Sequence, residues 1–158
     1  EVRMSGKDYS ADGQDVVELV FTGNKNAELR PIASIASGGE IARLMLALKC
    51  LIAKSAELPT IIFDEIDTGV SGDVAGRMGE MMAEMAKDIQ VITISHLPQI
   101  AARGGQHFKV FKHDTDDATV TQIVELTATE RELEIAEMLS GKNPSEAAIG
   151  AARELLMK

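Results

Sequence analysis

The clearest feature of the sequence is the spacing of its apolar residues. Between residues 40 and 56 they recur every three or four positions, which predicts an α-helix, and further apolar residues on its other side predict burial nearly all round. Residues 60–63 and 89–95 form two uncharged, mostly apolar runs, which predict buried β-strands over 60–64 and 89–95. A helix predicted over 71–88 separates these strands, so we expect them to be parallel and covered on both faces.

Weaker sequence patterns predict further elements before and after these strands. A strand is predicted at 15–23, and a short helix is predicted after the second apolar run. Residues 107–112 and 118–126 flank a turn-rich segment, which predicts an antiparallel hairpin. The order of elements predicts one α/β domain over 1–158, with a mainly parallel sheet flanked by helices and an antiparallel hairpin beside it.

Two helices are predicted at the end of the chain, over about 129–140 and 143–156. Each begins with a residue that can cap a helix and, three positions later, a glutamate that can bond back to it. These predicted capping boxes are Thr129 with Glu132 and Asn143 with Glu146.

Composition and charge narrow the function classes. The formal net charge is −9, and an acidic surface repels phosphate, so this chain alone is not expected to grip DNA. The single cysteine, Cys50, excludes an internal disulfide and fits a reducing cytosol. No signal peptide or membrane-spanning apolar run is predicted, since Arg43 and Lys49 interrupt the longest apolar stretch. The first residues lack an initiator methionine, and we expect a piece of a longer chain.

Three carboxylates follow the first buried strand in the stretch "TIIFDEIDTG". Asp64 and Glu65 end the strand and Asp67 comes two residues later. Ligands bind beyond the carboxyl ends of parallel strands, and successive side chains point opposite ways, so adjacent acids can serve different tasks. One can hold Mg²⁺ through its waters and the other can orient an attacking water. A solvated turn after a strand explains the same stretch equally well.

Two glycines stand at the start of the long helix, in "SIASGGEIARL". Ser37 and Glu40 have the spacing of a capping box, and Gly38 and Gly39 occupy the first helical positions between them. Glycine costs about 1 kcal/mol relative to alanine inside a helix, so a compensating role is expected. Bare amides at a helix N-terminus bind anions, and phosphate is the obvious candidate. The alternative is a flexible start to a helix.

His96 follows the second apolar strand, at the sheet edge where the carboxylates are expected. A neutral imidazole there can hydrogen-bond a phosphate oxygen or the attacking water. The structural alternative is a residue at the start of the short helix, with Ser95 as the cap instead. No spacing of histidine and cysteine suits a structural zinc site.

The order of these pieces resembles the C-terminal lobe of ABC-class ATPase heads, where they are called signature motif, Walker B motif, D-loop and switch histidine. The stretches "IASGGEIARLMLALK", "IIFDEIDTGVSG" and "ISHLPQIAA" look like the RecN family of bacterial DNA repair ATPases, relatives of the SMC proteins. The match runs from about Val17 to the end of the chain. The resemblance implies the C-terminal lobe of a P-loop ATPase head in a cytoplasmic, nucleoid-associated protein.

The resemblance also implies roles for individual residues. Asp64 matches the Walker B acid that binds Mg²⁺ through water, and Glu65 matches the catalytic acid that polarises the attacking water. Asp67 matches the D-loop acid, which crosses the dimer interface in such proteins, and His96 matches the switch histidine at the γ-phosphate of ATP.

The signature motif is matched by Ser37, Gly38, Gly39 and Glu40. In ABC-class heads this motif contacts the γ-phosphate of ATP held by the opposite subunit. The resemblance therefore implies a second head as a partner, in a dimer that forms with ATP.

A loop that cradles phosphates needs the pattern G-x-x-x-x-G-K-[ST], which this sequence lacks. Gly-Lys occurs at Gly6 and at Gly141, in neither case with a glycine five positions earlier or a hydroxyl residue after the lysine. The resemblance places the missing loop in an N-terminal Walker A lobe of the same protein. ATP hydrolysis and contact with DNA, in double-strand break repair and recombination, are then expected of the full-length protein, and this chain alone is expected to be inactive.

Three alternatives remain at this stage. The chain could be the head lobe of another ABC or SMC ATPase, which shares the same motifs. It could be a non-enzymatic interaction module whose carboxylates form a docking surface. A metal nuclease, in which the acids cut DNA without ATP, is the third.

Overall fold

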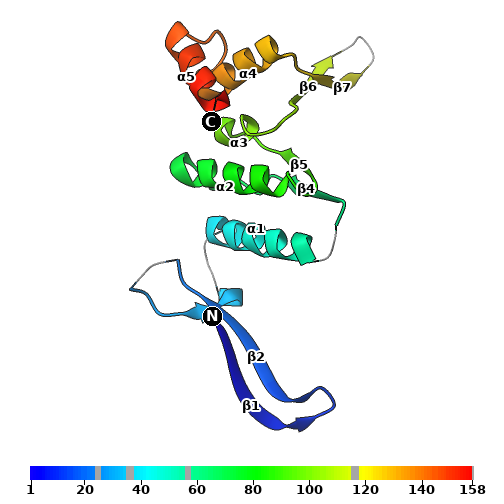
Figure 1. The fold of residues 1–158 in the computed structure, drawn as a ribbon, viewed down its shortest axis with the longest axis vertical. Helices are drawn as coiled ribbons and strands as arrows, with labels where there is room; N and C mark the ends of the chain where they lie inside the picture. Colours follow the sequence, from blue (N-terminus) through cyan, green and yellow to red (C-terminus); the bar gives the residue numbers. More distant parts are fainter. Residues whose placement is uncertain (24–25, 35–37, 56–57, 115–117, 158) are drawn as a thin grey trace.

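The structure is a computed structural model that describes residues 1–23, 26–34, 38–55, 58–114 and 118–157 (Figure 1). The elements follow one another along the long axis of the molecule, from an N-terminal hairpin to a C-terminal pair of helices. Helices and strands are both present, and a pair of parallel strands lies near the middle, as expected for an α/β lobe. Among the described helices, none has the length and apolar character that crossing a membrane requires.

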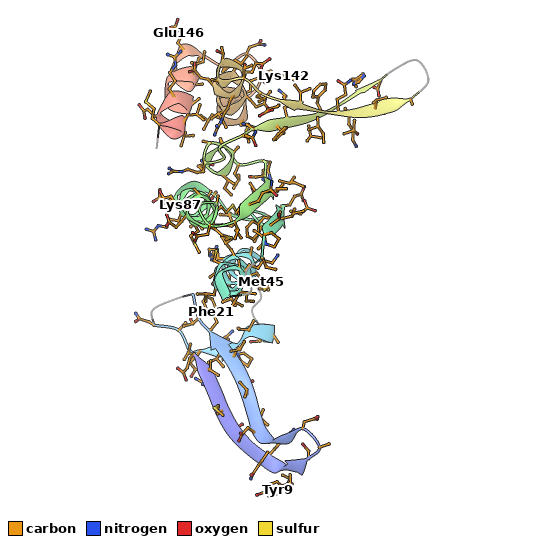
Figure 2. The ribbon with its side chains drawn as sticks, turned by 45° about the vertical axis from the view of Figure 1, so that its right-hand side comes forward. Tyr9, Phe21, Met45, Lys87, Lys142 and Glu146 are labelled. Carbon is orange, nitrogen blue, oxygen red and sulfur yellow. The ribbon has the colours of Figure 1, made fainter. Side chains whose placement is uncertain are left out.

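The N-terminal part is a three-stranded antiparallel sheet of β1 (Val2–Ser10), β2 (Gly13–Phe21) and β3 (Arg30–Pro31). The predicted strand at 15–23 corresponds to β2, whereas β1 was not predicted because its sequence lacks a clear alternation of apolar and polar residues. The hairpin of β1 and β2 projects from the rest of the molecule, with Tyr9 close to its far end (Figure 2). Its side chains are exposed along nearly the whole length.

The centre of the molecule is the parallel pair of β4 (Thr60–Asp64) and β5 (Gln90–Ile94). The helices α1 (Gly38–Ser55) and α2 (Gly72–Met85) lie beside this pair in Figure 1, and α2 connects the two strands. Their apolar side chains form the main core with the strands. The fully buried members of this core include Leu46, Phe63, Met78, Met82, Met85 and Ile100.

Only one face of the parallel pair is covered. Phe63 is buried on the inner face, but Ile62, Ile92 and Ile94 on the outer face are exposed, so the prediction of cover on both faces is wrong for the described chain. The prediction that the long helix is buried nearly all round is also wrong, since Leu51 and its neighbours on α1 are exposed. The physical reason is the same in both cases: the described elements pack on one side only.

The C-terminal part holds the short helix α3 (Pro98–Ala101), the antiparallel hairpin of β6 and β7, and the helices α4 and α5. The predicted hairpin and both predicted helices are present. A second, smaller core joins this part, with Ala102, Ile135, Ala136 and Ala152 as its buried residues. The bounds are Phe108–Asp114 for β6, Thr119–Glu125 for β7, Ala128–Ser140 for α4 and Glu146–Leu156 for α5.

The two capping boxes predicted here were misplaced by two residues. Helix α4 is capped by Thr127, whose side chain accepts from the Glu130 backbone while the Glu130 side chain accepts from the Thr127 backbone. Helix α5 is capped by Ser145, whose hydroxyl accepts from the Ala148 amide. Asn143 instead has a φ of 61°, a left-handed conformation that asparagine tolerates and that precedes the helix.

Candidate active site

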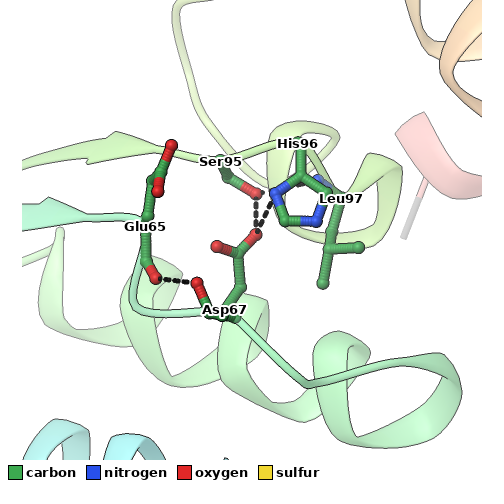
Figure 3. A network of polar contacts seen from close by, with 6 residues as sticks. Glu65, Asp67, Ser95, His96 and Leu97 are labelled. Atoms are coloured by element: carbon green, nitrogen blue, oxygen red, sulfur yellow. Dashed lines mark hydrogen bonds and ion pairs between the residues drawn. The ribbon is translucent and has the colours of Figure 1, made fainter.

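Glu65, Asp67 and His96 lie together at one edge of the parallel pair (Figure 3). Asp64 is the last residue of β4 and stands opposite Ile94, the last residue of β5. The Glu65 amide extends this pairing by one step, donating to the Ile94 carbonyl at 3.1 Å. His96 follows two residues after Ile94, and the chain order alone therefore brings it to the edge where both carboxylates are exposed.

Glu65 adopts an unusual backbone conformation, with a φ of 46°. A positive φ is disfavoured for a residue with a side chain, at a cost of about 1–3 kcal/mol, and it persists where neighbouring contacts hold it. Thr68 supplies those contacts, since its hydroxyl and its amide donate to the Glu65 carbonyl at 2.9 and 3.3 Å. The chain thus turns sharply at the acid proposed to act on water.

Asp67 turns inward, with a fully buried side chain. Its Oδ2 accepts a short hydrogen bond of 2.5 Å from the Ser95 hydroxyl and lies 3.9 Å from Nδ1 of His96. Its Oδ1 has no hydrogen-bond partner among the described residues. The D-loop role at a dimer interface, implied by resemblance, stays a prediction for Asp67, because in this chain the carboxylate is occupied inside the lobe.

His96 exposes most of its ring at the strand end, with Nδ1 turned toward Asp67. The side chain is 69% exposed. Leu97 stands at the cap position of α3 without a side-chain cap, so the alternative that Ser95 caps this helix is wrong. The Ser95 hydroxyl instead accepts from the Leu97 amide at 3.0 Å, one residue before the helix begins at Pro98. The backbone of α3 in turn lies against α2 at Gly79, where an added Cβ would come within 3.0 Å of the Gln99 carbonyl oxygen.

The glycines of the predicted signature motif lie at the start of α1. Ser37 is outside the described residues, and Gly38 is the first residue of the helix. Gly39 is buried, and a Cβ there would come within 3.2 Å of the Gly69 carbonyl oxygen. The bare backbone at Gly39 therefore allows close contact with the loop that follows the carboxylates, an intramolecular reason for glycine that the sequence did not reveal. Contact of this motif with phosphate stays a prediction.

Glu40 and the strand-end acids differ in their surroundings. The Glu40 carboxylate lies against the backbone of Gly23, where an added Cβ would overlap its Oε1. Asp64 and Glu65 are exposed at the strand end.

Among the described residues, no three histidine, cysteine or acidic side chains are grouped as metal ligands. Mg²⁺ bound to a nucleotide needs only one or two carboxylates, with phosphates and waters completing its shell, so the oxygen donors of this edge fit that ion.

Sequence reasoning missed the residues that hold the site together. Thr68, Gly69, Gly79 and Ser95 were not assigned roles beyond a possible cap, because each acts through a contact distant in sequence or through backbone geometry. Ser95 carried one usable signal. It precedes His96 and shares with Thr93 the inward face of β5, since side chains alternate along a strand.

Known proteins resemble this chain over nearly its whole length. It is 45% identical over 147 residues to the DNA repair protein RecN of Deinococcus radiodurans, and 40% identical over 156 residues to that of Rickettsia conorii. The chain belongs to the RecN family. These matches cover 93% and 99% of this chain but only 26% and 29% of the two relatives, so the chain spans less than a third of their length. No family model matches the chain.

The fold is that of SMC head domains. The SMC head domain of Pyrococcus yayanosii, solved with a coiled coil and joint, matches with a TM-score of 0.68 and 21% identity, over 89% of this chain and 26% of that chain. A chain from work on "ATP-driven dimerization and DNA stimulated activation of SMC ATPases" matches with a TM-score of 0.64 and 22% identity, over 90% of this chain and 83% of that one. At these identities, the likeness concerns the fold, and it agrees with the predicted α/β head lobe.

Proposed function

We propose that this RecN-family chain is the C-terminal lobe of an ATPase head in an SMC-like DNA repair protein. The observation that carries the proposal is the edge of the parallel pair, where an exposed acid, Glu65, and an exposed imidazole, His96, stand on neighbouring loops braced by a buried carboxylate. In phosphoryl transfer, catalysis consists mostly of positioning and of charge stabilisation, and rigid loops of this kind serve both.

Each residue at the edge has a task in this proposal. The Glu65 carboxylate accepts a hydrogen bond from the attacking water and orients it. The His96 ring donates to a γ-phosphate oxygen, and Asp64 holds the water shell of Mg²⁺. ATP with Mg²⁺ supplies the bond that is broken and the neutralising charge. Gly38 and Gly39, with Ser37 and Glu40, serve the nucleotide of a second head.

The proposal requires two partners. One is the N-terminal Walker A lobe of the same protein, because this sequence has no phosphate-cradling loop. The exposed outer face of β4 and β5 supports that partner, since parallel strands are ordinarily covered on both faces. The other is a second head, a proposal supported by the ATP-driven dimerisation named for the SMC chain of similar fold.

DNA contact is assigned to other parts of the full-length protein. The net charge of −9 makes this lobe a poor ligand for phosphate backbones. Action in the cytoplasm, at the nucleoid, follows from the same proposal, because the DNA that the full-length protein repairs is there. On this account the lobe contributes hydrolysis, and the rest of the protein contributes DNA binding.

The proposal is tested with Glu65→Gln in the full-length protein. Removing the acid that orients water is expected to lower kcat for ATP hydrolysis about 10²–10⁴-fold while ATP binding is retained. Glu18→Gln, on the exposed strand β2, is the matched control and is expected to hydrolyse ATP at the wild-type rate. Wild-type turnover by Glu65→Gln would refute the proposal, and so would a full-length protein without ATPase activity.

A further inference from the structure

The buried carboxylate of Asp67 is an expensive feature that packing alone does not explain. Burying an ionised group is costly unless it is paired, and among the described residues neither lysine nor arginine pairs with Asp67. Its Oδ1 has no described hydrogen-bond partner, which adds to the cost of burial. The compensating contact is the short hydrogen bond from Ser95, of the charge-assisted kind that is stronger than a neutral one.

The Ser95 hydroxyl makes two hydrogen bonds whose direction is fixed. A carboxylate only accepts, so the hydroxyl proton points at Asp67, and the oxygen is left to accept from the Leu97 amide at 3.0 Å. The two bonded residues flank His96 in the sequence. Ser95 thus fixes the backbone on both sides of His96 and leaves the ring exposed (Figure 3).

The Ser95–Asp67 hydrogen bond is also linked to Glu65 through the turn that contains Asp67. Asp67 lies in the turn between Glu65 and Gly69, and its carbonyl accepts from the Val70 amide at 3.0 Å. Thr68, in the same turn, holds the strained backbone of Glu65. One side-chain hydrogen bond, from Ser95 to Asp67, therefore joins the turn that carries the acid to the turn that carries the histidine.

We propose that Ser95 is a positioning residue that, through Asp67, sets the distance between Glu65 and His96. The inference rests on the proposed function, because it gives the Ser95–Asp67 hydrogen bond a role in placing the groups that act in ATP hydrolysis. This role differs from a purely structural one in its consequence. Loss of the Ser95–Asp67 hydrogen bond is expected to weaken the contacts of Glu65 and His96 with the transition state more than it weakens nucleotide binding.

The test compares Ser95→Ala, Ser95→Thr and Ser140→Ala in the full-length protein. Ser140 is the matched control, since its hydroxyl is partly buried and donates to the Ala136 carbonyl at 3.0 Å, on a helix that contributes nothing to the site. For Ser95→Ala we expect kcat to fall about 10–100-fold with KM for ATP within about threefold, because misplacement of catalytic groups by about 1 Å has effects of this size. Ser95→Thr retains the hydroxyl and is expected to recover most of kcat, and Ser140→Ala is expected to keep it.

A second readout follows the histidine itself. In spectra of protein labelled with ¹⁵N at histidine, the His96 ring signals are expected to move in Ser95→Ala and to stay in place in Ser140→Ala. If Ser95→Ala does not fold, Ser95→Cys, which keeps nearly the same volume but donates weakly, replaces it and is expected to show the same loss of kcat.

Several results would overturn the inference. They are wild-type kcat in Ser95→Ala or Ser95→Cys, equal impairment in Ser95→Thr and Ser95→Ala, and an equal loss in Ser140→Ala. The result also separates this inference from the proposed function. If Glu65→Gln abolishes hydrolysis while Ser95→Ala does not alter it, the ATPase assignment stands and only the role of Ser95 is wrong.

Discussion

The strand-end region, residues 60–102, and the C-terminal region, residues 107–157, use their polar side chains differently. In the C-terminal region, Thr127 and Ser145 cap the helices that follow them. In the strand-end region, Ser71 precedes α2 without making a side-chain cap, and α3 has Leu97 at its cap position. Polar groups near the site are instead committed to contacts between loops.

The difference extends to electrostatics. Lys109 on β6 pairs with Glu134 and Glu137 on α4, and Arg153 on α5 pairs with Glu132 on α4, so these ion pairs join separate elements of the C-terminal region. In the strand-end region the buried Asp67 carboxylate is bonded to Ser95 on a neighbouring loop. Both regions contain buried polar atoms without a described partner: Asp67 Oδ1 and Thr93 Oγ1 in the strand-end region, and His107 Nδ1, His113 Nδ1 and Arg131 Nε in the C-terminal region. The comparison teaches that side-chain contacts in the C-terminal region join helices and strands, whereas the Ser95–Asp67 contact of the strand-end region joins the loops that carry the exposed acid and histidine.

The largest effect should come from breaking the backbone contact that places α3. Gly79→Ala would put a Cβ within 3.0 Å of the Gln99 carbonyl and of Arg103 Cγ, and the backbone carbonyl cannot move aside easily. We expect a loss of about 1–3 kcal/mol in the opening free energy of α2 and α3, measured by native-state hydrogen exchange.

Gly76→Ala, on the same helix, is the control for this change. A Cβ at Gly76 meets nothing within 4 Å, and alanine is the better helix former, so α2 should gain about 0.5–1 kcal/mol. Equal effects of the two substitutions would contradict the view that α3 is held by close approach at Gly79.

A smaller effect on stability is expected to distinguish α4, which has a side-chain cap, from α2, which has none. Thr127→Ala removes a side-chain cap and should destabilise the first turn of α4 by about 1 kcal/mol. Ser71→Ala removes no cap bond, and the first turn of α2 should change by less than about 0.5 kcal/mol. Amide exchange at both helix starts measures the difference, and the contrast between the regions fails if Ser71→Ala costs as much as Thr127→Ala.

The smallest effect concerns pH in the C-terminal region. Burial lowers the pKa of His107 below its ordinary value of 6.5, and the nearby positive charges of Arg131 and Lys109 act in the same direction against the opposing effect of Glu134. As pH falls through about 6.5, the unfolded chain takes up a proton before the folded chain does. Stability is therefore fully present above that pH and declines below it.

Thermal unfolding followed between pH 7.5 and 5.5 tests this dependence. The midpoint should fall as the pH is lowered, and His107→Gln should flatten the profile over that range, because glutamine does not titrate. Carboxylates change charge mainly below this window, which keeps the two contributions apart. A profile in His107→Gln as steep as in the wild type would assign the dependence to other groups.

The parallel core was predictable from the sequence because its signal is local. Residues 60–64 are uncharged up to Asp64, and the strand β4 has those bounds in the structure. The position of Asp64, Glu65 and His96 at one edge followed from chain order and the rule for parallel strands. What the sequence does not record is which faces stay uncovered, since Ile62 reads as a core residue whether or not a partner lies over it.

The helix caps show where local rules stop. Thr127 with Glu130 and Thr129 with Glu132 both fit the spacing of a capping box, and only the helix phase that buries Ile135 decides between them. Asp67 shows the same limit for the site, because an aspartate in a turn is ordinarily solvated. Its burial depends on Ser95, 28 residues later in the chain, and no local pattern contains that contact.

The positive φ of Glu65 sets a limit on how this protein can be improved. A glycine at that position would relieve the backbone at no steric cost, so a laboratory selection for heat resistance alone should drift toward glycine there. Such a variant would lose the carboxylate that the proposed reaction needs. Thermal stability and the rate of the proposed ATP hydrolysis are thus opposed at a single position of the chain.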